Sequence, residues 1–506
     1  MNDSRALQVL KKLSVHELVV EKKRVKATYT VQQMDGSLAS NELIYSYDQV
    51  YFDPTQAEDV NLASVMAAQV ALNYGLFFKE IEFDGLYDET DQRFLRDMME
   101  NTSREIYVNK FLQPNEFLKA PFNQLEAVQQ KEYTAAAVKF VNSRYGHLRL
   151  VKTQVQTDKD HYAILSSGGK DSLLTYGLVR EIGTAHPVFI NESGRHWFTA
   201  VNAYKYYKEI EPNTVKPWCN SDRIFNWMVR QMPFIREDYA QVRADIYPIR
   251  LWTVAVFLFG VLPVVRKRGI RHILIGNEYD TTLKSNFKGI TSYHGLYDQS
   301  KYFDNALTRY YARKGWGIYQ YSMLRSLSEL LILKVLVKRY PELQQHQVSC
   351  HAAHEQDGRM YPCGNCEKCR RIIGMLKALD EDPRRCGYTD AQITRALKAL
   401  EEKSVKQIGS DAAHLYYLLL SKGLIAANER TRKLAKPHPE ILQLRFDQER
   451  SNLADLPRSV RKPLFQLILP YANGAVKLEK GKVGEFEVDQ EFLESVPYGA
   501  NNPTIA

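Results

Sequence analysis

Residues 164–174, with the sequence ILSSGGKDSLL, constrain the fold of this chain more than any other segment. An apolar run typical of a buried strand leads into the segment, and a helical pattern follows it. Gly168 and Gly169 can adopt positive φ and carry no Cβ, so backbone N–H groups can turn toward an anion. The start of the helix adds unpaired N–H groups and the positive end of its dipole. The segment predicts a phosphate-binding turn; the alternative is a plain glycine turn between a strand and a helix.

Residues 161–345 alternate short apolar runs with longer helical patterns. This alternation is typical of βαβ units around a parallel sheet. We predict strands at 162–165, 188–190 and 272–275, and helices at 173–180, 248–265 and 323–336. The predicted fold class is therefore α/β, with a doubly wound parallel sheet whose strands end at the phosphate turn.

A chain of 506 residues is too long for one core, so further regions are expected. An N-terminal α+β region (1–150) has strand patterns at 27–31 and 43–47 and a helical pattern at 63–74, and no chemistry is assigned to it. The phosphate-turn domain spans 151–345, and 346–427 is a cysteine-containing region with helices at 372–379, 393–400 and 411–421. In the C-terminal extension (428–506), prolines and polar residues predict that 428–463 wraps the surface and that 498–506 frays.

Composition narrows the class of protein. Apolar residues make up 44% and charged residues 25%, which excludes a disordered or fibrous chain. The net charge of +9 suits an enzyme of phosphate-rich substrates and a nucleic-acid binder alike. The longest apolar stretch, 251–265, is too short to span a bilayer and predicts a buried helix. With no secretory pattern at the N-terminus, a cytoplasmic protein without a membrane partner is expected.

Four of the six cysteines fall within twenty residues: Cys350, Cys363, Cys366 and Cys369. Three of them have C-x₂-C-x₂-C spacing, and four thiolates in a compact loop satisfy tetrahedral Zn²⁺ with no open position. We therefore predict a structural zinc site. An iron–sulfur cluster uses the same ligands and remains the alternative, whereas His351 and His354 are not needed as ligands.

The phosphate turn is not a Walker loop, which would need glycine at position 164 and a hydroxyl residue at 171. It resembles the SGGxDS motif of the PP-loop ATP pyrophosphatases, which cleave ATP to AMP and pyrophosphate. The resemblance implies that Ser167, Gly168, Gly169 and Ser172 bind the pyrophosphate oxygens. It also implies that Lys170 neutralises the leaving group and that Asp171 places Mg²⁺.

Two polar segments follow other predicted strands and face the same crevice. Asn277, Glu278 and Asp280 are candidates for substrate or metal contact, and a polar turn or helix cap is the alternative. Residues 191–193, with the sequence Asn-Glu-Ser, follow the second strand at the level expected for adenine and ribose.

The turn and the later cysteine pattern together resemble the 7-cyano-7-deazaguanine synthases. They are still more similar to the UDP-N-acetylmuramoyl-L-alanyl-L-glutamate epimerases, which add a long N-terminal region. The similar segments are 72–79, 105–109, 321–329 and 405–409. The chain departs from the pattern at Ser167, where a glycine is expected, and in a longer 283–318; beyond about residue 430 no counterpart is identified.

Both families imply that a substrate carboxylate attacks the α-phosphate of ATP to give an acyl-adenylate. In the epimerases the adenylate acidifies the neighbouring Cα hydrogen, which a base removes before reprotonation on the opposite face. The expected partner is a small carboxylate, with a UDP-sugar dipeptide as the specific expectation; the sequence does not specify an oligomeric state. Candidates for a polar role in that proton transfer are His196, Glu278, Arg325 and Glu329.

A third interpretation is a zinc-containing PP-loop protein that binds or modifies RNA. Basic residues at 266–268 and Arg271 would then hold the nucleic acid. The same cations close a predicted helix, where they suit its dipole without any RNA.

Overall fold

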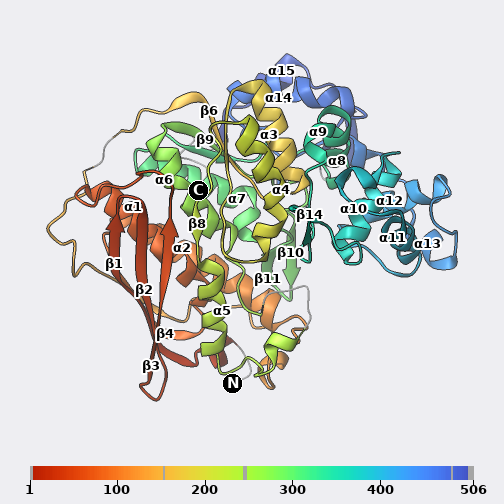
Figure 1. Cartoon of the computed structure of the whole chain (residues 1–506). Helices are drawn as coiled ribbons and strands as arrows, with labels where there is room; N and C mark the ends of the chain where they lie inside the picture. Colours follow the sequence, from red (N-terminus) through yellow and green to blue (C-terminus); the bar gives the residue numbers. More distant parts are fainter. Residues whose placement is uncertain (1–3, 152–153, 243–247, 480–481, 500–506) are drawn as a thin grey trace.

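The computed structural model describes residues 4–151, 154–242, 248–479 and 482–499 (Figure 1). A six-stranded sheet occupies the N-terminal part, in the order β5-β4-β1-β2-β3-β8. Its strands are β1 (Leu10–Glu21), β2 (Arg24–Gln32), β3 (Leu38–Ser46), β4 (Phe78–Asp84), β5 (Ala137–Val141) and β8 (Trp218–Cys219). Helices α1 (Ala57–Ala68), α2 (Glu89–Ile106) and α5 (Ser221–Gln231) accompany it.

Buried and more exposed side chains alternate along the strands of this sheet. Every second residue of β2 is buried, from Val25 to Val31, because successive side chains of a strand point to opposite faces. Strand β8 comes from beyond residue 150 and pairs Cys219 with Tyr45 of β3. The N-terminal sheet and helix α6 (Val254–Lys267) share one hydrophobic core. The N-terminal region therefore packs directly against the central domain.

The central domain is α/β with a four-stranded parallel sheet, the class that the sequence predicts, although the strand predicted at 188–190 lies at 184–188. Its order is β12-β9-β6-β7, from β6 (Asp158–Leu165), β7 (Thr184–Val188), β9 (Ile270–Leu274) and β12 (Tyr319–Tyr321). Along β6, Ala163 enters the core that contains α6, whereas Tyr162 and Ile164 enter the core that contains α3 (Lys170–Ile182). Helices therefore cover both faces of the sheet.

Two predicted helices begin later than their apolar patterns suggest. Helix α6 begins at Val254 rather than 248, because the Asp298 carboxylate accepts hydrogen bonds from the N–H groups of residues 253, 254 and 255. Helix α8 (Glu329–Arg339) begins at 329 rather than 323, because Ser328 caps it through the N–H of Leu331. Both starts are set by hydrogen-bonding caps, which an apolar periodicity does not reveal.

A helical lobe carries the cysteines, at the right of Figure 1. It contains α9 (Pro341–Gln344), β13 (His354–Gln356), β14 (Arg359–Tyr361), α10 (Glu367–Ala378), α11 (Asp390–Glu402), α12 (Gly409–Ser421) and α13 (Glu429–Leu434). The three helices predicted here are present with longer bounds. The remaining central elements are α4 (Arg195–Ile210), β10 (Lys284–Phe287), β11 (Ile290–Tyr293) and α7 (Lys301–Arg313).

The prediction that 428–463 only wraps the surface is wrong. Strands β15 (Leu444–Asp447), β16 (Ala475–Glu479) and β17 (Lys482–Phe486) form a sheet, and α14 (Arg458–Ile468) packs on α3 and on α15 (Gln490–Glu494). Arg461 is fully buried and donates to the carbonyls of Leu456 and Leu493. Tyr498 is also buried, against Tyr319, so fraying does not begin there; 500–506 lie outside the described residues.

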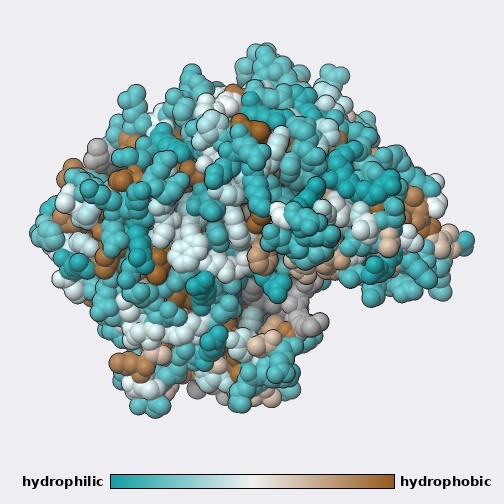
Figure 2. All heavy atoms as spheres, viewed as in Figure 1, coloured by the Kyte–Doolittle hydropathy of each residue, from teal (hydrophilic) through white to brown (hydrophobic). Residues whose placement is uncertain are grey.

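The face of the molecule seen in Figure 2 is mainly hydrophilic, with apolar side chains scattered rather than gathered. Among the described residues, no helix combines the length and apolar character needed to cross a membrane.

Candidate functional site

The phosphate turn lies where the sequence predicts it, between β6 and α3. Gly168 has φ of +74°, and a Cβ there would lie 2.2 Å from the carbonyl oxygen of Thr199. Gly169 differs from the prediction: its φ is −82°, because it is the N-cap of α3. Since glycine has no side chain to cap the helix, residue 169 leaves the first N–H groups of α3 uncapped, an arrangement suited to binding an anion.

Hydroxyl groups stabilise the turn through hydrogen bonds. Ser172 Oγ accepts from the N–H of Ser167 at 3.3 Å and donates to the Gly169 carbonyl at 3.1 Å. Thr199 Oγ1 donates to the Ser167 carbonyl at 3.0 Å and so ties the turn to α4. Hydrogen bonds therefore fix the turn at Ser167, near its start, and at Ser172, near its end.

Lys170 points into a group of carboxylates. Its Nζ lies 2.8 Å from Asp171 Oδ1, 3.3 Å from Glu278 Oε2 and 3.3 Å from Glu329 Oε1. Burial lowers the pKa of this lysine, but the three carboxylates raise it by more. The net pKa is well above the ordinary value for lysine. The predicted phosphate lysine is therefore a buried cation that holds three acidic side chains together.

The acidic side chains have different environments. Burial, the largest cause, raises the pKa of Glu278 well above its ordinary value. For Glu329, burial is outweighed by Lys170 and Arg371, which together lower its pKa. Asp280 has a raised pKa, again mainly through burial, and its Oδ1 has no hydrogen-bond partner among the described residues.

Two cavities adjoin the turn and share Ser167, Asp171 and His196. The larger, of about 480 Å³, has an apolar wall of Ile190, Val254 and Phe257. The smaller, of about 200 Å³, lies between the turn and residues of the cysteine-bearing lobe.

Only some of the residues that the sequence marks as candidates line these two cavities. Asn277 and Glu192 line the larger cavity, whereas Asn191 and Ser193 line a neighbouring surface hollow. Asn277 is buried, and its Nδ2 has no partner among the described residues. Burial, with a further contribution from His351, lowers the pKa of His196 to about 3, so its imidazole is neutral. Of the candidates for proton transfer, His196 alone lines the larger cavity, while Glu329 lines the smaller.

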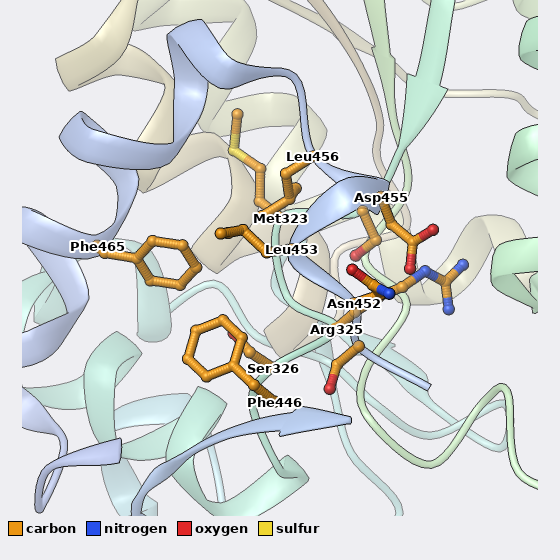
Figure 3. A pocket seen from close by; sticks show the side chains of 11 residues that line it. Met323, Arg325, Ser326, Phe446, Asn452, Leu453, Asp455, Leu456 and Phe465 are labelled. Carbon is orange, nitrogen blue, oxygen red and sulfur yellow. The ribbon is translucent and has the colours of Figure 1, made fainter. Parts of the chain in front are cut away.

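Arg325 lines neither of these two cavities. It forms a buried ion pair with Asp304 and donates to Thr281 and Thr282. The void beside it, between residues 322–326 and the C-terminal region, holds about 10 Å³ (Figure 3). That volume admits about one water molecule, so Arg325 acts in packing.

Three of the four basic residues at 266–268 and 271 are engaged within the protein. Arg266 pairs with Asp59 and lies over the ring of Trp316. Arg268 donates to the Asn213 carbonyl, and Arg271 donates to Thr157. These contacts account for the three arginines without any RNA, whereas Lys267 is exposed.

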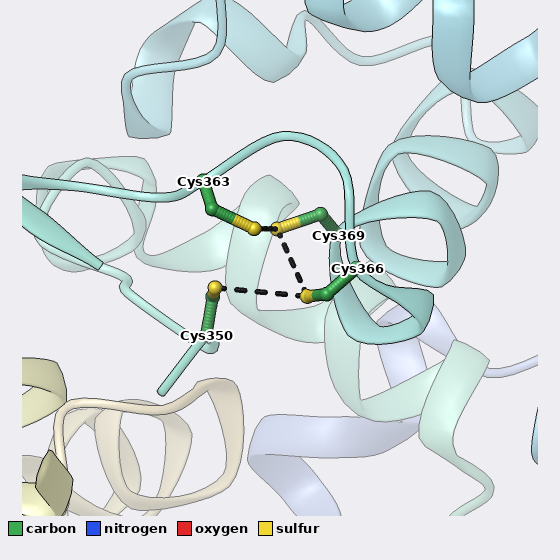
Figure 4. Close-up of side chains that lie close together, drawn as sticks. All are labelled: Cys350, Cys363, Cys366 and Cys369. Atoms are coloured by element: carbon green, nitrogen blue, oxygen red, sulfur yellow. Dashed lines mark hydrogen bonds between the residues drawn. The ribbon is translucent and has the colours of Figure 1, made fainter. Parts of the chain in front are cut away.

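The four cysteines converge as predicted (Figure 4). Their sulfur atoms lie within 4.8 Å of one another, with contacts of 3.5, 3.6 and 3.8 Å. Ligands about 2.3 Å from a tetrahedral Zn²⁺ stand about 3.8 Å apart. The cluster could therefore hold a metal ion such as zinc, and neither His351 nor His354 belongs to it.

The sequence did not reveal two cations of the larger cavity, Lys110 and Arg250. Both lie outside recognisable motifs and far from the turn in sequence. The sequence analysis also gave no role to Gly276: a Cβ there would lie 2.7 Å from Asp171 Cβ, so the segment after β9 approaches the turn closely.

Comparisons of this chain with protein-family models, curated proteins and solved structures find no match.

Proposed function

We propose that this protein is a PP-loop ATP pyrophosphatase that adenylates a substrate carboxylate. The carrying observation is the turn at Gly168, whose backbone conformation excludes a side chain and which opens onto a cavity with an apolar wall. A volume of about 480 Å³ lies within the range of roughly 300–1,000 Å³ typical of small-molecule sites. Adenosine would contact Ile190 and Phe257, with its phosphates on the turn.

In the proposed reaction a carboxylate oxygen bonds to the α-phosphorus, and the bond from that phosphorus to the bridging oxygen of pyrophosphate breaks. The N–H groups at the start of α3 and the hydroxyls of Ser167 and Ser172 stabilise the leaving charge. Lys170 orients Asp171 by a direct ion pair.

Mg²⁺ fits the acidic side of the site, because Asp280 Oδ1 is buried without a hydrogen-bond partner among the described residues. Asp171 lines both cavities and would hold the ion, with Glu278 and Asp280 behind it. When bound, Mg²⁺ would neutralise phosphate charge. Cys350, Cys363, Cys366 and Cys369 would hold structural Zn²⁺, as their spacing suits.

The sequence resemblance favours epimerisation of the terminal L-glutamate of a UDP-N-acetylmuramoyl dipeptide, a peptidoglycan precursor. Inversion at Cα requires a proton acceptor beside the adenylate. His196 is the one candidate for proton transfer that lines the larger cavity, but its pKa of about 3 makes the neutral imidazole a weak base, so the proposal rests on its position alone. Nitrile formation from 7-carboxy-7-deazaguanine is the competing reaction of the same adenylate chemistry.

The test is pyrophosphate release from MgATP with each of those two carboxylates in turn. We expect release with the UDP-dipeptide, deuterium incorporation at the glutamate Cα in D₂O, and loss of both in Asp171→Ala. Asp160→Ala, an exposed aspartate on β6, is the matched control. ATP binding without release from either carboxylate would contradict the adenylation proposal.

A further inference from the structure

The larger cavity contains two buried polar side chains that keep an unbonded atom. Glu192 and Asn277 both line it, and each is 2% exposed. Glu192 Oε2 and Asn277 Nδ2 have no hydrogen-bond partner in the part of the chain that the structure describes. Native proteins bond the large majority of such buried atoms, so each exception needs an explanation. Beside a cavity of about 480 Å³, a polar contact with the bound ligand is that explanation.

The two atoms lie on opposite sides of the phosphate turn. Glu192 follows β7 and Asn277 follows β9, and β6, which leads into the turn, lies between these two strands. The carboxyl ends of parallel strands meet at one edge of a sheet, so one ligand seated on the turn can reach both. An ionised carboxylate accepts a hydrogen bond, whereas an amide nitrogen donates one. The two side chains therefore contact different parts of the ligand.

The fold holds both residues in place. Glu192 Oε1 accepts from the N–H of Trp197, in the first turn of α4, at 3.2 Å, which leaves Oε2 for the cavity. Burial, the largest cause, raises the pKa of Glu192, and the N–H groups around it lower that pKa by less. Ser322 Oγ accepts from the Asn277 N–H at 3.1 Å and donates to the Asn277 carbonyl at 2.7 Å.

The segment after β7 places Glu192 on the apolar wall of the cavity. Ile190 and Glu192 line the larger cavity, whereas Asn191 and Ser193 line the neighbouring surface hollow. In an extended segment alternate side chains share one side, so Glu192 lies next to Ile190. Ile190 and Phe257 form the wall against which the adenine of ATP would pack. The Glu192 carboxyl therefore faces the edge of a base that lies on that wall.

We propose that Glu192 is a specificity-determining residue that accepts a hydrogen bond from the exocyclic amino group of adenine. The inference rests on the proposed function and deepens it, since it states how the site selects ATP. Adenine carries N–H donors at this position, whereas guanine carries a carbonyl oxygen, which a carboxylate repels. Asn277 donates to an acceptor that all purine nucleotides share.

The probes are ATP and purine riboside 5′-triphosphate, which lacks only the amino group. We expect calorimetry with Mg²⁺ on the full chain to give at least about tenfold tighter binding of ATP. This comparison uses wild-type protein and needs no variant to fold. Equal binding of the two nucleotides would overturn the proposal. Loss of affinity for 2′-deoxy-ATP, with none for purine riboside triphosphate, would assign Glu192 to the ribose and would equally overturn it.

Glu192→Gln tests the residue itself. The Trp197 N–H requires an acceptor on its side, so the glutamine oxygen takes that position and the amide N–H groups face the adenine amino group. The preference for ATP should fall to within about threefold. Asn277→Ala should weaken both nucleotides and keep their ratio. Glu209→Gln, an exposed glutamate of α4, is the matched control and should keep both affinities. A full preference for ATP in Glu192→Gln would refute the assignment.

The two proposals fail in different ways. Wild-type protein that binds ATP but does not distinguish it from purine riboside triphosphate would overturn the role of Glu192 alone. Wild-type protein that binds neither nucleotide would overturn the proposed function, and this inference with it.

Discussion

Two buried lysines near the same cavities have opposite surroundings. Lys170 lies against three carboxylates, which raise its pKa, whereas Lys110 lies beside Arg250 and its pKa falls to about 8. The first cation is satisfied by the fold and fixes the acidic side chains behind the phosphate turn. The second lies among apolar and basic neighbours, so burial and the charge of Arg250 disfavour its protonated form.

Chelation of the metal ion that the four cysteines could hold should have the largest effect on stability. Zinc adds roughly 10–16 kcal/mol to isolated zinc-finger peptides, and we expect several kcal/mol here because the lobe is also held by packing. Thermal unfolding with and without chelator, for wild type and Cys366→Ser, measures it. Cys219→Ala, outside the cluster, should keep its chelator sensitivity. Purified protein without zinc or iron would contradict the prediction.

Lys170→Met should destabilise the protein by about 3–5 kcal/mol, because Asp171, Glu278 and Glu329 would lose their shared cation. Urea unfolding at pH 7 measures the loss. The deficit should shrink at pH 5, where protonation relieves repulsion among the acids. Exposed Lys159→Met is the control. An unchanged free energy of unfolding in Lys170→Met would show that the carboxylates do not depend on this lysine.

Gly168→Ala should weaken ATP binding roughly 100-fold or more, because a Cβ would collide with the Thr199 carbonyl at a positive φ. Gly169→Ala is the matched control. That position has φ of −82°, and the nearest atom to an added Cβ is 3.6 Å away. Titration calorimetry with ATP compares them, and equal losses would refute the distinction between the two glycines.

Lys110→Met should stabilise the protein at pH 7, in contrast to Lys170→Met. The gain is at most about 3 kcal/mol, since the pKa of Lys110 falls from 10.5 to about 8 and each unit is worth about 1.4 kcal/mol. Urea unfolding gives the difference. A large loss of stability would mean that the contacts of the Lys110 side chain outweigh the penalty of burying its charge.

The pH dependence of stability gives a finer test of the same lysine. Between pH 8 and 10.5 the unfolded chain binds the Lys110 proton more tightly than the folded one, so this group's penalty is full below about pH 8 and fades as pH rises. The stability difference between wild type and Lys110→Met should therefore narrow over that window. A difference that stays constant from pH 7 to 10 would contradict the lowered pKa.

The features that sequence alone predicted depend on contiguous residues. The turn between β6 and α3 and the cysteine cluster each lie within a short segment, where spacing determines geometry. The parallel sheet follows from alternating patterns for the same reason. The sequence also placed Lys170 at the turn, but not its three carboxylate contacts, two of which come from residues more than a hundred positions away.

What the sequence did not predict depends on contacts between distant segments. Lys110 and Arg250 line one cavity although 140 positions separate them, and Asn115 links the carbonyls of Lys110 and Pro248. Asp298 sets the start of α6 from a position beyond the helix. The C-terminal core was missed because its apolar residues, such as Phe446 and Phe465, are scattered among polar ones and prolines.

The packing of α14 on α3 has a consequence for biosynthesis. Helix α3 carries the phosphate turn at its start, and Arg445, which stacks 3.8 Å from the ring centre of Tyr279, approaches the neighbouring turn after β9. The proposed nucleotide site therefore acquires its last supports only after about residue 468 has left the ribosome. A nascent chain stalled before that point would carry the whole motif without the helix that packs behind it.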